Sequence, residues 1–219
     1  WQISTTGTSG PWTDIPSANG ATYNAPAGLT STSYYQRIAI STLNGIECDA
    51  TSINAVTVIA NSVTAGTISS NRTVCSGGDP VAFTESTPAT GTGITYQWQS
   101  STTSGAGPWI NIGGATSATY NVPGGVTTTT YYQRVVTATV NGTGCEATSN
   151  FLVVFANDIS PSTIAGNQTI CSTEDPTAFT VTTPASGSGT LSYQWQSAPS
   201  ASGPWTNINL ATSATYDPP

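Results

Sequence analysis

The chain has 219 residues, of which ten are acidic and three are arginines, and it contains no lysine, histidine or methionine. Charged residues make up 6% of the chain, against roughly 25% in an average soluble domain, whereas serine and threonine together account for 68 residues. A net charge of -7 and three scattered arginines exclude the basic stripe that nucleic-acid binding requires. The lack of histidine excludes a Ser-His-Asp triad and any histidine-ligated metal.

An internal repeat organises the chain. When the sequence is shifted by 97 residues, residues 1–51 overlay residues 98–148 without a gap, and 28 of 51 positions are identical. The segments YQWQS, GPW, SATY, YYQR and DPxAFT also recur. A period near 100 residues is longer than that of solenoid repeats, which is roughly 20–50 residues, so each unit should have its own hydrophobic core.

Short segments of β-forming residues, separated by turns rich in Gly, Pro and Asn, predict strands along the second unit, and no segment shows sustained helical periodicity. The clearest alternation of apolar and polar residues surrounds Trp98 in the segment ITYQW. In chain order, the predicted strands lie at Val81–Ser86, Ile94–Trp98, Trp109–Ile112, Ala118–Val122, Tyr131–Val140 and Asn150–Phe155.

Seven short strands, counting one before Val81, are the number found in an immunoglobulin-like β-sandwich. We therefore predict an all-β chain of tandem immunoglobulin-like β-sandwiches with a repeat of about 97 residues. Residues 62–157 form the one complete unit, residues 1–61 hold the late strands of a partial unit, and residues 158–219 hold the early strands of another. A half-sandwich leaves a sheet edge and half a core in water, so we expect the natural protein to be longer.

Three aromatic residues are the predicted structural core of the complete unit. Trp98, on the third strand, should fill the space between the two sheets, and Tyr131 or Tyr132 should be the corner tyrosine of the sixth strand. The short linkers at Ser62–Gly66 and Asp158–Ser162 should restrict bending between units.

Five segments of the complete unit carry a family resemblance: TVCSGGDPVAFT, YQWQSS, ATYNVP, TTTYYQRVVT and NGTGCEATSN. They resemble the Ig-like or PKD-like repeats of Bacteroidota surface proteins, and the resemblance spans the whole chain. Such repeats occur in giant adhesins exported by the type IX secretion system, including SprB-type adhesins of gliding motility. They also decorate secreted hydrolases. The resemblance implies an extracellular, cell-surface and outer-membrane-associated location.

From the repeat and the resemblance we expect a structural stalk or filament repeat of an adhesin, serving surface attachment or gliding motility. Its expected partners are neighbouring repeats of the same chain, with a surface polysaccharide or substratum as a further candidate; no nucleic-acid partner and no membrane insertion of this segment are expected. No cofactor is expected, and calcium is the one metal that the few acidic turn residues bring into consideration.

Two other classes of function compete with the stalk. One is a carbohydrate-binding accessory module of a secreted polysaccharide-degrading enzyme, in which the GPW tryptophans Trp12, Trp109 and Trp205 stack on sugar rings. Their recurrence among other fold landmarks favours a packing role instead. The other class, an enzyme, would need paired carboxylates, and Glu85 has Val181 as its counterpart in the third unit. We therefore expect no catalytic activity.

The four cysteines recur with the repeat. Cys75 and Cys171 precede the second strand of their units, and Cys48 and Cys145 follow the sixth. In an extracellular chain this pattern predicts disulfides, with Cys75 bonded to Cys145 and with the partners of Cys48 and Cys171 in parts of the protein beyond these 219 residues. A second possibility is a bond between units, since in a standard sandwich these positions lie roughly 25 Å apart at opposite ends.

Overall fold

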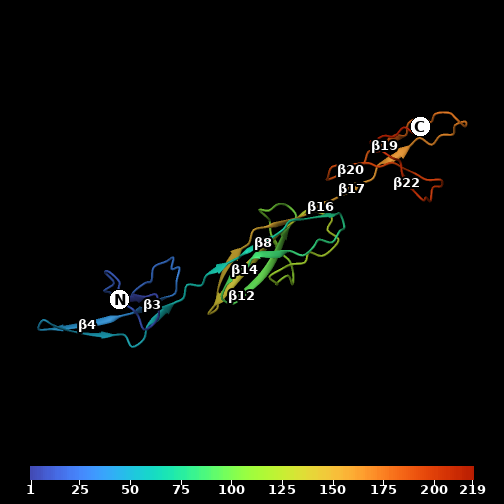
Figure 1. Cartoon of the computed structure of the whole chain (residues 1–219). Helices are drawn as coiled ribbons and strands as arrows, with labels where there is room; N and C mark the ends of the chain where they lie inside the picture. Colours follow the sequence, from blue (N-terminus) through green and yellow to red (C-terminus); the bar gives the residue numbers. More distant parts are fainter.

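The computed structural model describes all 219 residues and contains strands, turns and loops but no helix. Three bodies follow one another in an elongated arrangement, with the two termini at opposite ends (Figure 1). They are called here the first unit (1–61), the middle unit (62–157) and the third unit (158–219). The predicted all-β fold of sandwich-type repeats is confirmed.

The larger sheet of the middle unit has six strands. Five of them follow the order β13-β12-β14-β16-β9, and β15 pairs with the far part of β14. All the pairs are antiparallel except β16 with β9, which is parallel. The strands are β9 (Arg72–Cys75), β12 (Ile94–Ser101), β13 (Ile110–Asn111), β14 (Thr130–Val140), β15 (Thr143–Thr148) and β16 (Leu152–Asn157).

Two strand pairs form the opposite layer of the middle unit: β8 (Thr67–Ser69) with β10 (Thr84–Thr87), and β7 (Val63–Thr64) with β11 (Thr90–Gly91).

The predicted strand at Ala118–Val122 is wrong, because this segment is irregular. It makes one backbone hydrogen bond to the second-strand region, from the Phe83 N–H to the Tyr120 carbonyl. The physical reason is that side chains occupy the carbonyls at its start: Arg134 donates to the carbonyl of Ala118, and the Trp98 indole donates to that of Ser117, the residue just before the segment. These carbonyls are therefore unavailable for a regular ladder.

The middle unit encloses its own core. Eight buried residues pack together there, and all of them lie between positions 68 and 154, so neither outer unit contributes to this interior. The eight are Ile68, Phe83, Trp98, Ala115, Val122, Tyr132, Leu152 and Val154.

The first unit has a four-stranded sheet, of order β2-β1-β3-β6, and a hairpin, β4-β5. In the repeat these strands correspond to the later strands of the middle unit, from β12 onward. Their bounds are β1 (Gln2–Ser4), β2 (Thr13–Asp14), β3 (Ser33–Gln36), β4 (Ile38–Leu43), β5 (Ile46–Thr51) and β6 (Val56–Val58).

The third unit has only strand pairs: β17 with β20, β18 with β19 and β21 with β22. They correspond to the earlier strands of the middle unit, up to β13. Their bounds are β17 (Ile159–Ser160), β18 (Thr163–Ala165), β19 (Thr180–Thr183), β20 (Ser186–Gly187), β21 (Gln196–Ser197) and β22 (Thr206–Asn207).

Candidate functional site: the core, the cysteines and the unit junctions

Four aromatic side chains fill the space between the layers of the middle unit, and we call them the aromatic quartet: Phe83, Trp98, Tyr120 and Tyr132. Trp98 is fully buried, with ring centroids 5.8 Å from Phe83 and 5.5 Å from Tyr120. Tyr132 lies 5.4 Å from Phe83. The sequence reasoning singled out Trp98 and Tyr132 and missed the other two. Their signal is the recurrence of AFT and ATY at the same places in the repeat.

Strand alternation separates the two candidate corner tyrosines on β14. Tyr132 points into the core and is 7% exposed, whereas Tyr131 points to the other face and lies half-buried, 6.0 Å from Phe151. Burial raises the pKa of the Tyr132 phenol, the charge of Tyr120 raises it further, and a hydrogen bond with the Thr130 side chain partly offsets the rise. The phenol of Tyr132 is thus held neutral as part of the core.

Arg134 is a charged residue inside the middle unit. Its guanidinium is fully buried, with Nη1 2.6 Å from Glu85 Oε1 and Nη2 donating to the Ala65 carbonyl at 2.8 Å. It also lies 4.7 Å from the ring centroid of Tyr96. These contacts tie β14 to the opposite layer. Because the cation is enclosed and its charge is paired, the arrangement is typical of a structural ion pair rather than a ligand site.

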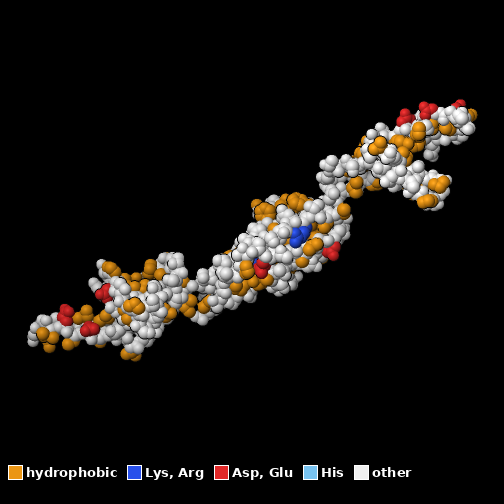
Figure 2. Space-filling model, viewed as in Figure 1, with side chains coloured by type: hydrophobic (Ala, Val, Ile, Leu, Met, Phe, Trp, Pro, Cys, Tyr) orange, Lys and Arg blue, Asp and Glu red, His pale blue; other side chains and the backbone are white.

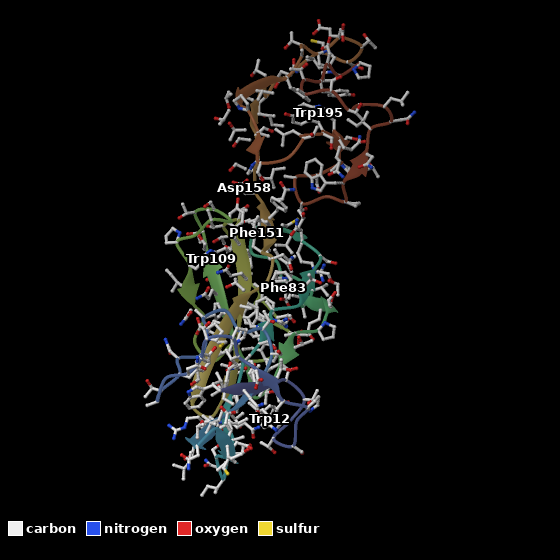
Figure 3. The ribbon with its side chains drawn as sticks, turned by 90° about the vertical axis from the view of Figure 1, so that its left-hand side faces the viewer. Trp12, Phe83, Trp109, Phe151, Asp158 and Trp195 are labelled. Atoms are coloured by element: carbon white, nitrogen blue, oxygen red, sulfur yellow. The ribbon has the colours of Figure 1, made fainter.

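The three GPW tryptophans lie in three different units and do not form one platform; Figure 3 labels Trp12 in the first unit and Trp109 in the middle unit. Each indole folds back over its own glycine: a Cβ at Gly107 would lie 2.9 Å from Trp109 Cδ1. Gly10 and Gly203 approach Trp12 and Trp205 in the same way. The glycine therefore leaves the space that the indole occupies.

The exposure of these tryptophans differs between units. Trp12 and Trp109 are half-buried, while Trp205 is 55% exposed. Trp205 borders a hollow of about 380 Å³ together with Ile164 and Trp195. The counterparts of Ile164 and Trp195 in the middle unit are the buried Ile68 and Trp98, so this hollow corresponds to the core that β14 and β16 cover there.

The four cysteines are unbonded in the structure, so the predicted Cys75–Cys145 disulfide is wrong. Cys75 ends β9 and pairs with Asn157, beside the third unit, whereas Cys145 pairs with Ala138 near the opposite end of the sheet. The ladder positions of the two cysteines differ by a distance of about 35 Å at 3.3 Å per residue, far beyond the roughly 7 Å between Cα atoms that a disulfide allows. Cys48 and Cys171 are also free and exposed.

The junctions between units consist largely of strands. Between β16 and β17 only Asp158 intervenes, and Figure 3 places it where the middle and third units meet. The Asp158 N–H donates to Ser188 Oγ at 3.1 Å, and its carboxylate accepts from the Ser188 N–H at 3.1 Å. The predicted linkers Ser62–Gly66 and Asp158–Ser162 therefore contain the paired strands β7 and β17.

The first junction is held by a side chain. Asn61 Nδ2 donates to the Ala138 carbonyl at 2.8 Å and to the Thr143 carbonyl at 3.1 Å. Both carbonyls belong to the β14–β15 hairpin of the middle unit. The end of the first unit is thus bonded directly to the hairpin of the next unit.

A metal site and a membrane-spanning helix are two other features that would bear on function. No group of three or more His, Cys, Asp or Glu side chains is positioned to share a metal ion. No helix is present that is long and apolar enough to cross a membrane. The junctions, the cysteines and the aromatic quartet are therefore the features on which a functional argument can be built.

A closed sandwich flanked by two half-units defines a protein of tandem immunoglobulin-like β-sandwich repeats. Three successive segments, residues 1–62, 64–158 and 160–219, match the model of a family described as "Domain of unknown function (DUF8696)". The chain therefore belongs to this family, as three consecutive members. No curated protein and no solved structure matches the chain.

Proposed function

We propose that the chain is a spacer: a run of structural repeats in the extracellular stalk of a bacterial cell-surface adhesin, exported by type IX secretion and used for surface attachment or gliding motility. The observation that carries the proposal is the junction geometry. Successive units lie end to end (Figure 1), and a single residue separates the last strand of the middle unit from the first strand of the third. A chain built in this way keeps its two ends at a fixed separation and carries a pulling force from one end to the other.

Hydrogen bonds at both junctions support the proposed stiffness. At the first junction the Asn61 amide binds two carbonyls of the next unit, and at the second Ser188 Oγ of the third unit donates to Asn157 Oδ1 of the middle unit at 2.9 Å. Flexible linkers, by contrast, are Gly- and Ser-rich segments without such partners. Each unit adds roughly 35 Å of length, from an 11-residue β14 at about 3.3 Å per residue.

The surface chemistry also suits a spacer. Charged atoms are sparse on the face shown in Figure 2, in keeping with a chain in which 6% of residues are charged. Hydroxyl-rich strand faces stay hydrated while they offer few ionic contacts. Such a surface limits nonspecific ionic association along the stalk.

Small-angle X-ray scattering of the chain tests the spacer function. We expect a rod-like particle whose distance distribution matches the extended structure. Inserting four Gly-Ser residues between Asn157 and Asp158 should broaden that distribution. The same insertion between Gly113 and Gly114, in an exposed turn within the middle unit, is the matched control and should change it little. If the unmodified chain scatters like its own junction-insertion variant, the units are already flexibly joined and the stalk proposal is wrong.

A carbohydrate-binding accessory module is the second candidate, favoured by the ring of Trp109, which stays half-buried rather than fully buried in the closed middle unit. Its test is calorimetric titration of the chain with soluble polysaccharides. A saturable heat that Trp109→Ala removes would support this candidate, while the spacer proposal expects no saturable heat.

A further inference from the structure

We propose that successive complete units of this family are joined by a disulfide between the early cysteine of one unit and the late cysteine of the next. The early cysteine means Cys75 and its repeat counterparts, and the late cysteine means Cys145 and its counterparts. This covalent site goes beyond the spacer function and does not depend on it. It follows from where the structure places these cysteines relative to the first junction.

The late cysteine faces the segment through which the preceding unit enters. Cys145 pairs with Ala138 in the β14–β15 hairpin, and paired residues of a ladder project from the same face. Ala138 is fully buried at the junction: a Cβ at Gly91 would lie 2.8 Å from Ala138 Cβ and 3.1 Å from the Ser62 carbonyl oxygen. The Cys145 side chain therefore shares the hairpin face that packs against this entry segment.

The early cysteine can be placed at the same junction through the repeat. Cys75 pairs with Asn157 on the parallel β9–β16 ladder. The repeat relates Asn157 to Asn61, so the early cysteine of the unit preceding the middle unit would lie one strand away from Asn61, about 4.8 Å. Its side chain would project from the same face as that of Asn61.

Asn61 connects the two placements. Its amide reaches the carbonyls of Ala138, which is the ladder partner of Cys145, and of Thr143, two residues before it. The early cysteine beside Asn61 and the late cysteine beside Ala138 therefore face the same small region. A disulfide needs Cα atoms within about 7 Å of each other. The early cysteine lies one strand from Asn61 and the late cysteine lies one strand from Ala138, so the Asn61–Ala138 contact brings the two cysteines toward that distance.

The same placement accounts for the four free thiols in the structure. Residues 1–61 correspond to the part of a unit after its early cysteine, and residues 158–219 correspond to the part before its late cysteine. None of the four cysteines has its proposed partner within the 219 residues.

Bond formation is a two-electron oxidation. Two S–H bonds break and one S–S bond forms, releasing two protons and two electrons. A disulfide oxidant, either a thiol–disulfide oxidoreductase or a small-molecule disulfide, takes up both and is cleaved to two thiols. The reaction proceeds by attack of one thiolate on the oxidant and then of the second thiolate on the mixed disulfide.

The first test uses the chain as it stands. The chain is incubated with oxidised glutathione and the monomer is isolated. Glutathione that is bound to a cysteine as a mixed disulfide is then removed by limited thiol exchange, and the free thiols are titrated in denaturant. The proposal expects all four cysteines to remain free. A monomer with two free thiols and a Cys75–Cys145 crosslink would overturn it, because the bond would then close within one unit.

The second test supplies the missing partner. A second copy of residues 62–157, inserted between Asn157 and Asp158, gives a chain with six cysteines and two complete units in succession. Under the same oxidation we expect four free thiols and one bond, from Cys75 of the first copy to the inserted counterpart of Cys145, identified by mass spectrometry of the unreduced digest. Cys75→Ser in the first copy should leave five free thiols and no bond.

The remaining outcomes of the second test are also decisive. Six free thiols in a variant whose circular dichroism shows folded units would overturn the proposal, and so would bonds confined within each copy. If the enlarged variant does not fold, the thiol count of the unmodified chain still shows whether Cys75 and Cys145 pair within one unit or remain free. X-ray scattering reports on the spacer function separately, so a failure of one proposal is distinguishable from a failure of the other.

Discussion

The same tryptophan–tyrosine motif occurs in all three units, and only the middle unit buries it. In each unit the tryptophan of the third strand lies within 6 Å of a tyrosine ring and donates its indole N–H to a backbone carbonyl. The ring distances are 5.9 Å for Trp1–Tyr23, 5.5 Å for Trp98–Tyr120 and 5.4 Å for Trp195–Tyr216, and the hydrogen bonds are 3.0, 2.9 and 2.9 Å long. Trp98 is fully buried, whereas Trp1 and Trp195 are half-buried.

The difference shows which part of the fold is local and which is not. The tryptophan–tyrosine pair and its hydrogen bond form within about 25 residues, so they need only the third strand and the segment after β13 or its counterpart. Burial needs two more rings, Phe83 from one half of the unit and Tyr132 from the other, and only the middle unit has both. A closed core therefore requires strands from both halves of the repeat.

Trp98→Ala should have the largest effect on this comparison. Removing a fully buried tryptophan from a packed core costs about 3–5 kcal/mol of unfolding free energy, whereas Trp195→Ala should cost about 1–2 kcal/mol because its ring is half in water. Hydrogen–deuterium exchange during denaturant titration measures each unit separately, because the β12 and β14 amides report on the middle unit and the β18 and β19 amides report on the third unit. Equal losses for the two variants would show that the middle core is no tighter than the open one.

Arg134→Met should have the next largest effect. It leaves the Glu85 carboxylate without its partner and frees the Ala65 and Ala118 carbonyls, at a cost of about 3 kcal/mol for a broken buried pair. The repeat counterpart Arg37 is exposed and donates to a single carbonyl, so Arg37→Met should not measurably change stability.

A double-mutant cycle separates the ion pair from packing. Arg134→Met combined with Glu85→Leu should recover part of the loss, since the second substitution removes the unpaired charge. If the double variant is as unstable as the sum of the single variants, the pair contributes nothing beyond the volume of its side chains.

Much of this fold could be predicted from periodicity and recurrence. Alternation around Trp98 and the YYQR segment indicated the paired strands β12 and β14, which carry the core on one face. The repeat located three units and showed which segments each of them contains. Periodicity is a local property and recurrence is found by comparing the sequence with itself. A single sequence is therefore sufficient to detect both.

Long-range pairing was the part that the sequence did not show. The Arg134–Glu85 pair joins residues 49 positions apart, and nothing in either local segment indicates the contact. The irregular segment at Ala118–Val122 follows from the same kind of contact, because distant side chains take its carbonyls. The cysteine pairing failed for a related reason: β9 runs parallel to β16 toward the third unit, so Cys75 lies far from Cys145.

Trp109→Ala should have a smaller effect than the core substitutions. The indole is half-buried over Gly107, and its removal should cost about 1–2 kcal/mol from lost apolar contact. Thermal unfolding followed by calorimetry measures this loss. The more exposed Trp205 is the matched comparison, and Trp205→Ala should change stability less. A stability unchanged by Trp109→Ala would contradict the packing role and favour a surface function for this ring.

The smallest effect should appear at high pH, through the buried phenol of Tyr132 in the closed unit. Burial raises the pKa of this phenol above the ordinary value of 10.0, and the neighbouring Tyr120 adds to the rise. The unfolded chain therefore loses this proton first as the pH rises above 10. The unfolding free energy should fall from that point until the pH passes the folded pKa, by up to about 1.4 kcal/mol per pH unit for one such group.

Tyr132→Phe isolates this contribution, because phenylalanine keeps the ring and removes the titrating group. The fall in unfolding free energy between pH 10 and 11 should be shallower in Tyr132→Phe than in the unmodified chain. It should not vanish, since burial also raises the pKa of Tyr120. Tyr131→Phe, on the outer face of β14, is the control for general alkaline effects. Identical pH profiles for the unmodified chain and Tyr132→Phe would mean that the phenol already meets water in the folded unit, which would contradict its place in the closed core.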